Sequence, residues 1–154
     1  MVKRIFPTTV DNTYRGHVVG KWLLIFYVCK SIFAASVHMF ASDGGAQSIA
    51  TITLDQFTSG GADTVVTIFG LWGMEQMVIA IFAALILWRY KALIPMVAGI
   101  YVIEYLGRFL VGFVTPGVAT TGTPPGVSSD LILIPLTLVM LALTLYQKQP
   151  AADA

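Results

Sequence analysis

Long apolar runs constrain this chain more than any other feature of its sequence. They cover residues 18–40, 64–88, 92–114 and 127–146, and a helix needs about 20 apolar residues to cross a bilayer. The last run is the shortest, and it needs residues 127–130 to reach full length. Runs of this length predict helices, because a strand satisfies its backbone in lipid only within a closed barrel. We therefore expect an all-α, integral membrane four-helix bundle that forms a single transmembrane domain over residues 1–154.

The composition excludes several other classes of protein. Of the 154 residues, 56% are hydrophobic and only 11% are charged, whereas an average soluble domain has about 25% charged residues. A net charge of +1 supplies no basic surface for nucleic acid. The single cysteine, Cys29, excludes a disulfide framework within the chain, and the two histidines match no metal-ligand spacing. No enzyme motif is present, so we expect a non-enzymatic protein, with acid–base catalysis by Glu75 or Glu104 left open.

The distribution of lysine and arginine predicts the orientation of the four spans. Seven of these residues fall on one side of the membrane: Lys3, Arg4, Arg15, Lys21, Arg89, Lys91 and Lys148. The loops on the other side, 41–63 and 115–129, contain none. The positive-inside rule therefore places both termini in the cytoplasm.

The connections between the runs also carry information. The short basic link Arg89-Tyr90-Lys91 predicts that the second and third spans are antiparallel neighbours. The segment from Ile49 to Phe57 lies between two glycine pairs and could form a short element at the membrane interface.

Four charged residues interrupt the apolar runs near the middle of the membrane. They are Lys30, Glu75, Glu104 and Arg108, and their formal charges sum to zero. Each would cost at least about 2.5 kcal/mol if left alone in hydrocarbon, so we expect them to meet in an intramembrane polar cluster. Glu104 and Arg108 are four residues apart and can pair on one face of a helix. Two pairings stay open: Lys30 with Glu75 and Glu104 with Arg108, or Glu75 with Arg108 and Lys30 with Glu104.

This cluster has two interpretations. A buried salt-bridge network would fix the order and rotation of the helices, and a functional pocket or ion pathway would use the same residues. Trp72, Tyr101 and Tyr105 lie deeper than an interfacial belt requires, so they could line a cavity between the second and third spans or simply pack. His38, near the outer end of the first span, is expected to be a hydrogen-bonding residue, with a ligand role toward a pigment as the alternative.

Two segments resemble a known family. Gly70 to Glu75 and Glu104-Tyr-Leu-Gly-Arg-Phe-Leu110 resemble DoxX-like proteins, and related small four-helix bacterial membrane proteins of unknown function are equally similar. The resemblance covers mainly residues 64–114. It implies a bacterial inner-membrane four-helix bundle, and some relatives are quinone-linked accessory subunits. No catalytic residue is carried over by it.

Three functions are consistent with these features. The first is a non-enzymatic accessory or scaffold subunit of a larger membrane assembly or a homo-oligomer. The second is a small transporter or a proton or ion pathway through the Glu/Lys/Arg cluster. The third is an intramembrane module that binds a lipid or a quinone. No cofactor is required by the sequence, and the expected partners are membrane lipids, other membrane subunits or further copies of the chain.

Overall fold

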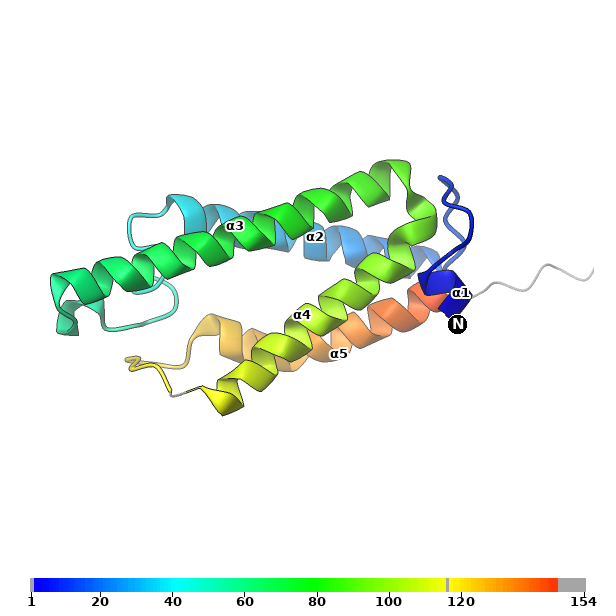
Figure 1. Ribbon diagram of the computed structural model, residues 1–154. Helices are drawn as coiled ribbons and strands as arrows, with labels where there is room; N and C mark the ends of the chain where they lie inside the picture. The colour runs from blue at the N-terminus through cyan, green and yellow to red at the C-terminus, as the bar shows by residue number, and fades with distance from the viewer. Residues whose placement is uncertain (1, 116, 147–154) are drawn as a thin grey trace, which may run out of the picture.

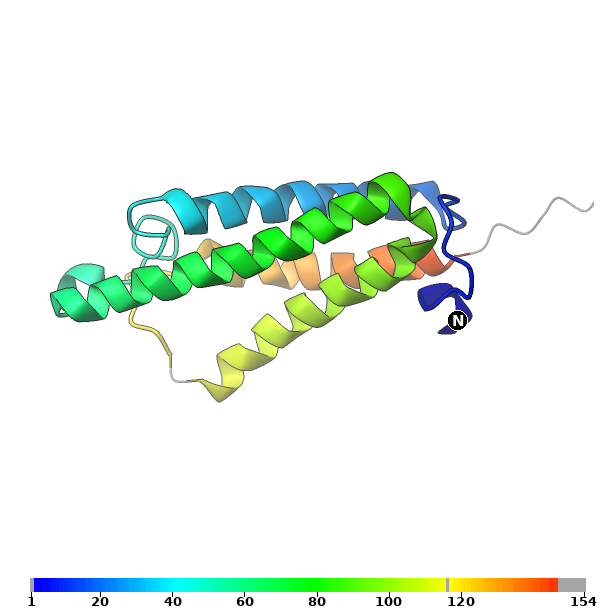
Figure 2. The same ribbon diagram turned by 45° about the horizontal axis from the view of Figure 1, so that its top comes forward.

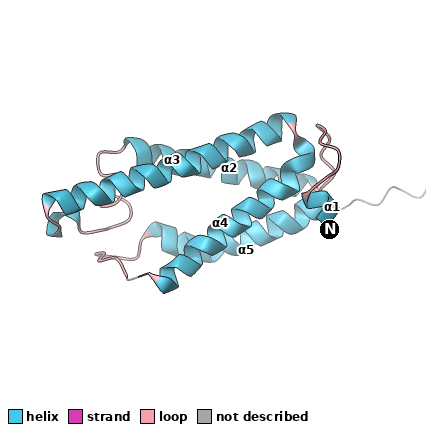
Figure 3. Cartoon of the chain, viewed as in Figure 1, coloured by secondary structure: helices cyan, strands magenta, loops and turns pink. Residues whose placement is uncertain are grey.

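A computed structural model describes residues 2–115 and 117–146 of the chain. The helices are α1 (Val2–Ile5), α2 (Val18–Phe40), α3 (Ser59–Arg89), α4 (Ile94–Val114) and α5 (Pro125–Leu145), with single 3-10 turns η1 (Leu54–Gln56) and η2 (Lys91–Leu93). Within the described residues there is no strand (Figures 1 and 3). The all-α fold is confirmed, and so are four helices long and apolar enough to cross a membrane. Lys148 and the rest of the tail lie outside the described residues.

The helix ends differ from the predicted ones where local capping decides them. α2 has the predicted bounds, whereas α3 begins at Ser59 rather than at residue 64. The Thr58 side chain caps α3 by accepting a hydrogen bond from the Gly61 amide, and this stabilises a first turn that contains two glycines. α5 begins at Pro125, because a proline in the first turn has no amide that needs a partner.

The four long helices follow one another around the bundle in chain order, with a nearly open seam between α3 and α4. α2 packs along both α3 and α5, and α5 packs along α4, whereas α3 and α4 share few contacts. Figures 1 and 2 show α3 and α4 leaving their short link and running apart toward the other end of the molecule. The prediction that these two spans are antiparallel neighbours therefore holds only near the link. The buried face of α4 packs against α5 instead.

Three tyrosines at the centre of the bundle explain why α4 turns toward α2 and α5. Tyr27 of α2 and Tyr101 and Tyr105 of α4 are each at most 1% exposed. The Tyr27 ring lies 5.3 Å from the Tyr105 ring, edge to face, and its hydroxyl donates to the Leu133 carbonyl of α5 at 2.6 Å. The other buried core residues are Leu24, Val28, Ala83, Ile86, Ile94, Val97, Ala98, Leu133 and Met140. The Tyr27 hydroxyl is satisfied by its bond to Leu133, whereas the Tyr101 hydroxyl is buried without a partner among the described residues. The cluster joins three helices mainly through the packing of its rings.

A glycine allows α2 and α3 to approach closely. A Cβ atom on Gly73 would lie 2.7 Å from the His38 Cβ and 3.0 Å from the Ala35 carbonyl oxygen of α2. Only a residue without a side chain fits there, and close helix pairs of membrane proteins commonly have small residues at such contacts. α3 is therefore held by α2 and needs no support from α4.

The segment before α2 folds back across one end of the bundle. The Arg4 guanidinium donates to the Leu145 carbonyl at the end of α5 and to the Arg15 carbonyl. The His17 amide donates to the Leu143 carbonyl at 2.9 Å. These bonds satisfy carbonyls that the last turn of a helix leaves without an intrahelical partner.

The two loops at the opposite end pair with each other. Ile52 and Thr120 form an isolated antiparallel bridge, and the Thr121 amide donates to the Thr51 carbonyl at 3.0 Å. The predicted interfacial element at 49–57 thus consists of this bridge and the η1 turn. The bridge connects the α2–α3 loop to the α4–α5 loop, at the end where α3 and α4 are far apart.

Candidate functional site

A pocket of about 230 Å³ lies between α3 and α4, near the middle of both helices. It is lined by Trp72, Glu75, Gln76 and Ile79 of α3 and by Ile103, Glu104, Gly107 and Arg108 of α4. No third element contributes to the lining, so the pocket opens on the flank of the bundle. A Cβ atom on Gly107 would meet nothing within 4 Å, which shows that there is free space on the α4 side.

Arg108 is the charged centre of the site. Its Nη2 lies 2.7 Å from Oδ1 of Asp130 on α5, and its Nη1 lies 3.8 Å from Oε1 of Glu104 on its own helix. The three side chains are 24%, 13% and 19% exposed, so these ion pairs are partly open to the surroundings. The structure therefore shows a half-buried ion pair where the sequence predicted a buried salt-bridge network.

Lys30 approaches the same group of residues from α2 without an ion pair. Its Nζ lies 5.5 Å from the centre of the Tyr105 ring, and the Arg108 guanidinium carbon lies 4.4 Å from that centre. Two cations thus lie near one aromatic ring. Each cation–π interaction with this ring contributes about 0.5–2 kcal/mol.

Glu75 is exposed on α3, although it lines the pocket. Within the described residues, neither Glu75 nor Lys30 lies within 4.0 Å of a group of opposite charge. Of the pairs considered from the sequence, only Glu104 with Arg108 is close, and it is the weaker of the two Arg108 contacts. The separation of α3 from α4 explains why Glu75 does not reach Arg108.

Two polar atoms of the pocket residues are buried without a hydrogen-bond partner among the described residues. They are Oε1 of Gln76 and Nε of Arg108. Gln76 as a whole is only 7% exposed. An unpaired buried polar group costs about 1–3 kcal/mol, so such groups call for a partner from outside the chain. One of these atoms is an acceptor and the other carries a hydrogen to donate.

The structure separates the three aromatic residues that were considered as cavity lining. Trp72 lines the pocket, whereas Tyr101 and Tyr105 are buried in the core and do not. The reason is the rotation of α4, because successive residues of a helix point about 100° apart. With Tyr101 and Tyr105 facing α2 and α5, Glu104 and Arg108 face the pocket and the Asp130 side chain.

His38 is a hydrogen-bonding residue of the α2 C-terminus. Its Nδ1 lies 2.8 Å from the Gly44 carbonyl oxygen, so Nδ1 carries the hydrogen. Its ring stacks on Trp72 with 4.6 Å between ring centres and meets the edge of Phe69. These contacts agree with the structural interpretation of His38, and its ligand role toward a pigment stays a prediction.

Sequence reasoning missed two residues of this site. Asp130 was assigned to the edge of the last span, but α5 begins early enough to place it inside the helix beside Arg108. Gln76 is absent from the predicted cluster, because adjacent residues of a helix point about 100° apart, but the pocket is wide enough to include both Glu75 and Gln76. The usable signal was Asp130 itself, since it is the only charged residue of α5.

Comparison with known proteins adds no family to this description. No family model, no curated protein and no solved structure matches the chain. The resemblance to DoxX-like proteins therefore stays a prediction. The proton or ion pathway also stays a prediction. The polar side chains described above lie at one level on the flank of the bundle, whereas a pathway needs them along its length.

The Arg108–Asp130 ion pair gives the first testable prediction. Asp130→Asn removes a charged hydrogen bond between α4 and α5, so it should lower the free energy of unfolding by about 2 kcal/mol. Glu104→Gln is the matched control and should cost less than about 1 kcal/mol, because Glu104 makes only the longer contact. Denaturant unfolding in detergent measures both. Equal losses for the two variants would show that Asp130 has no special part in joining the helices.

Proposed function

We propose that this chain is a multi-pass protein of the bacterial cytoplasmic membrane, with both ends on the cytoplasmic side. The basic residues before α2 and in the α3–α4 link lie at one end of the bundle, where the N-terminal segment also contacts the end of α5. Exposed aromatic residues lie at the same end: Trp22, Trp88, Tyr90 and Tyr146. The loops at the other end contain no lysine or arginine. The positive-inside rule and the aromatic belt both support this orientation.

Cysteine labelling tests the proposed orientation. In a Cys29→Ser background, Gln47→Cys places a thiol in the α2–α3 loop, and Thr8→Cys places one before α2. A membrane-impermeant maleimide should label position 47 in intact cells and position 8 only after the membrane is opened. Labelling of position 8 in intact cells would contradict the orientation.

The function that we propose is the binding of a lipid-soluble molecule through its polar end in the α3–α4 pocket. The observation that carries this proposal is the pair of buried, unpartnered atoms, Gln76 Oε1 and Arg108 Nε, among the residues of one pocket. In hydrocarbon no water is at hand to satisfy them, so a bound molecule that both donates and accepts would remove their cost.

The surroundings of the pocket favour entry from the bilayer. The exposed neighbours of its α3 side are apolar, Leu71, Met74 and Val78, and so are Ile103 and Leu110 on α4. A molecule with a long hydrocarbon tail can keep the tail in lipid while its head enters between the two helices. Space at Gly107 allows the head to lie against the α4 backbone.

A quinol has the chemistry that the pocket requires. Each of its hydroxyl groups can donate a hydrogen bond, as Gln76 Oε1 requires, and can accept one, as Arg108 Nε requires. The oxidised quinone only accepts, so it would leave Gln76 without a partner. We therefore propose a quinol-binding module, in which the protein binds the reduced form more tightly and needs no catalytic group to do so.

Binding of a short-chain quinol tests this proposal. With Trp22 and Trp88 replaced by phenylalanine, quenching of the remaining Trp72 reports on the pocket. Gly107→Leu fills the pocket and should raise the Kd at least about tenfold, and Gln76→Leu should raise it about tenfold through one lost hydrogen bond. Gly99→Leu is the control, because Gly99 lies on the same helix, also has free space around it, and does not line the pocket.

The dimethyl ether of the same quinol separates hydrogen bonding from simple partitioning into detergent. It has no hydrogen to donate to Gln76, so it should bind at least about tenfold more weakly than the quinol. Quenching that does not saturate, or equal quenching in the wild type and in Gly107→Leu, would overturn the proposal.

One observation favours a second function, that of an accessory or scaffold subunit. Glu75 is exposed among apolar residues of α3 and has no ion pair with the described residues. A carboxylate in hydrocarbon costs at least about 2.5 kcal/mol, and a partner helix with a polar or basic residue would cover it. The partner would be another membrane subunit or a further copy of the chain.

If the partner is a further copy of the chain, the mass of the protein purified in mild detergent tests this second function. The wild type should be larger than a monomer, and Glu75→Gln should release the monomer, whereas Glu104→Gln should leave the oligomer intact. A monomeric wild type would exclude the homo-oligomer.

A further inference from the structure

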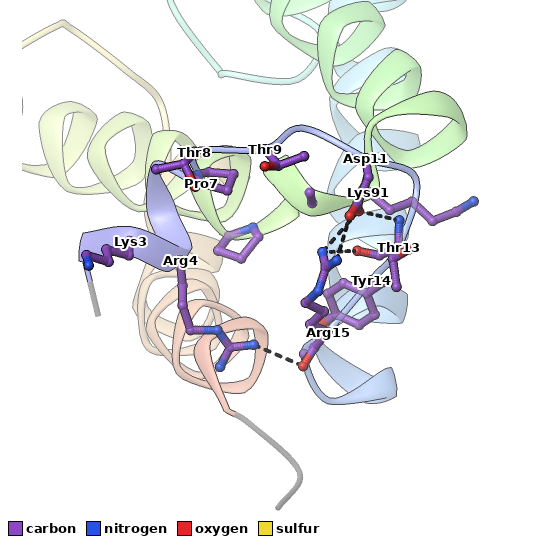
Figure 4. Close-up of a pocket in the computed structure, with 13 residues that line it drawn as sticks. Lys3, Arg4, Pro7, Thr8, Thr9, Asp11, Thr13, Tyr14, Arg15 and Lys91 are labelled. Carbon is purple, nitrogen blue, oxygen red and sulfur yellow. Dashed lines mark hydrogen bonds and ion pairs between the residues drawn. The ribbon is translucent and has the colours of Figure 1, made fainter. Parts of the chain in front are cut away.

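A second pocket lies at the basic end of the bundle and shares no lining residue with the α3–α4 pocket. It has a volume of about 250 Å³ (Figure 4). Its lining residues come from α1, the segment before α2, the α3–α4 link and the first turn of α4: Lys3, Arg4, Pro7, Thr8, Thr9, Asp11, Thr13, Tyr14, Arg15, Gly16, Lys91, Ala92 and Pro95. The pocket is built by the chain folding back, since the Ala92 amide donates to the Asp11 carbonyl at 3.2 Å.

The charges around this pocket do not balance. It is lined by four cations and one carboxylate. Arg15 pairs with Asp11 at 2.5 Å, and Figure 4 shows this pair on one side of the pocket. Hydrogen bonds from Arg15 and from the Thr13 amide lower the pKa of Asp11 to about 2, so this pair is present at neutral pH.

The three other cations have no carboxylate within 4.0 Å among the described residues. Arg4 donates to two backbone carbonyls, and Lys91 donates to the Asn12 side-chain carbonyl at 3.1 Å. These acceptors are neutral, so residues 2–115 and 117–146 supply no compensating charge for Arg4, Lys3 and Lys91.

The remaining lining suits an oxyanion. The Thr8 and Thr9 side chains border the pocket along the segment that leads from α1 to Asp11, and both are exposed (Figure 4). Hydroxyl, ammonium and guanidinium groups are the donors that proteins commonly place around phosphate oxygens. Prolines at positions 7 and 95 form rigid apolar walls beside these donors.

We propose that this pocket binds the phosphate group of an anionic phospholipid headgroup. The position favours a lipid over a soluble phosphate compound, because exposed Trp88 and Tyr90 flank the link that carries Lys91 and mark the level of the membrane interface. The cytoplasmic leaflet attracts basic segments at this level through its anionic lipids. The proposal shares with the preceding section only the placement of the bundle in the membrane, and it does not depend on the quinol pocket.

Lipid binding by two double variants tests the proposal. Lys3→Gln with Lys91→Gln removes two charges from the pocket, and Lys21→Gln with Arg89→Gln removes two charges from the same end of the bundle outside it. Binding of phosphatidylglycerol and of phosphatidylcholine is measured by native mass spectrometry of the purified full chain. The wild type should prefer phosphatidylglycerol, and the pocket variant should lose about fivefold in affinity for each lysine removed.

The control variant should bind within about twofold of the wild type, since its charges lie outside the pocket. Equal losses in both double variants would show a diffuse charge effect and overturn the site. Lys3→Arg with Lys91→Arg keeps both charges and should keep the lipid, and this separates loss of binding from loss of folding. Loss of the lipid from this conservative variant, with its unfolding midpoint unchanged, would also overturn the site.

A competition arm distinguishes the two sources of phosphate. Millimolar inorganic phosphate, or glycerol phosphate, should leave the bound phosphatidylglycerol in place. Displacement of the lipid by these soluble compounds would show that the pocket serves a soluble phosphate compound and would overturn the assignment to a headgroup.

Discussion

The ion pair between Arg108 and Asp130 holds α4 against α5, and this leaves the bundle open between α3 and α4. It joins α4 to α5 over a distance of 2.7 Å, while the tyrosine cluster buries the adjacent face of α4 against α2 and α5. α3 is held separately, by its close contact with α2 at Gly73. With α4 engaged on one side and α3 on the other, the facing polar residues of α3 and α4 do not close on each other, and a pocket remains between them.

The consequence is that polar groups occur at two levels of the proposed membrane protein. In the proposed membrane placement, the α3–α4 pocket presents an unpaired acceptor and an unpaired donor on the flank of the bundle, where lipid-soluble molecules or partner helices would reach them. The N-terminal pocket would present cations that have no compensating charge among the described residues at the level of the headgroups. The two proposed sites would therefore take different ligands, because one would satisfy hydrogen bonds in hydrocarbon and the other would balance charge at the interface.

Much of the fold could be predicted from the sequence, because bilayer thickness and helix geometry fix the length and number of the apolar runs. The starts of α3 and α5 differ from the predicted ones by a few residues, because the Thr58 cap and Pro125 set them locally. The site could be predicted only in part. That Glu75, Glu104 and Arg108 share a pocket follows from their depth in the runs, but the partner of Arg108 depends on helix rotation and on which helices are neighbours. No periodicity in a uniformly apolar run reveals these two properties, and this is why Asp130 and Gln76 were missed.

We propose that the space between α3 and α4 is a ligand site and is not a gap that closes in lipid. An experimental structure of the protein, extracted with its native lipids into nanodiscs, would decide between the two. We expect non-protein density within hydrogen-bonding distance of Gln76 Oε1 and Arg108 Nε, with Asp130 still paired to Arg108. A structure in which α3 has moved onto α4, with Glu75 paired to Arg108 and no density between the helices, would contradict it.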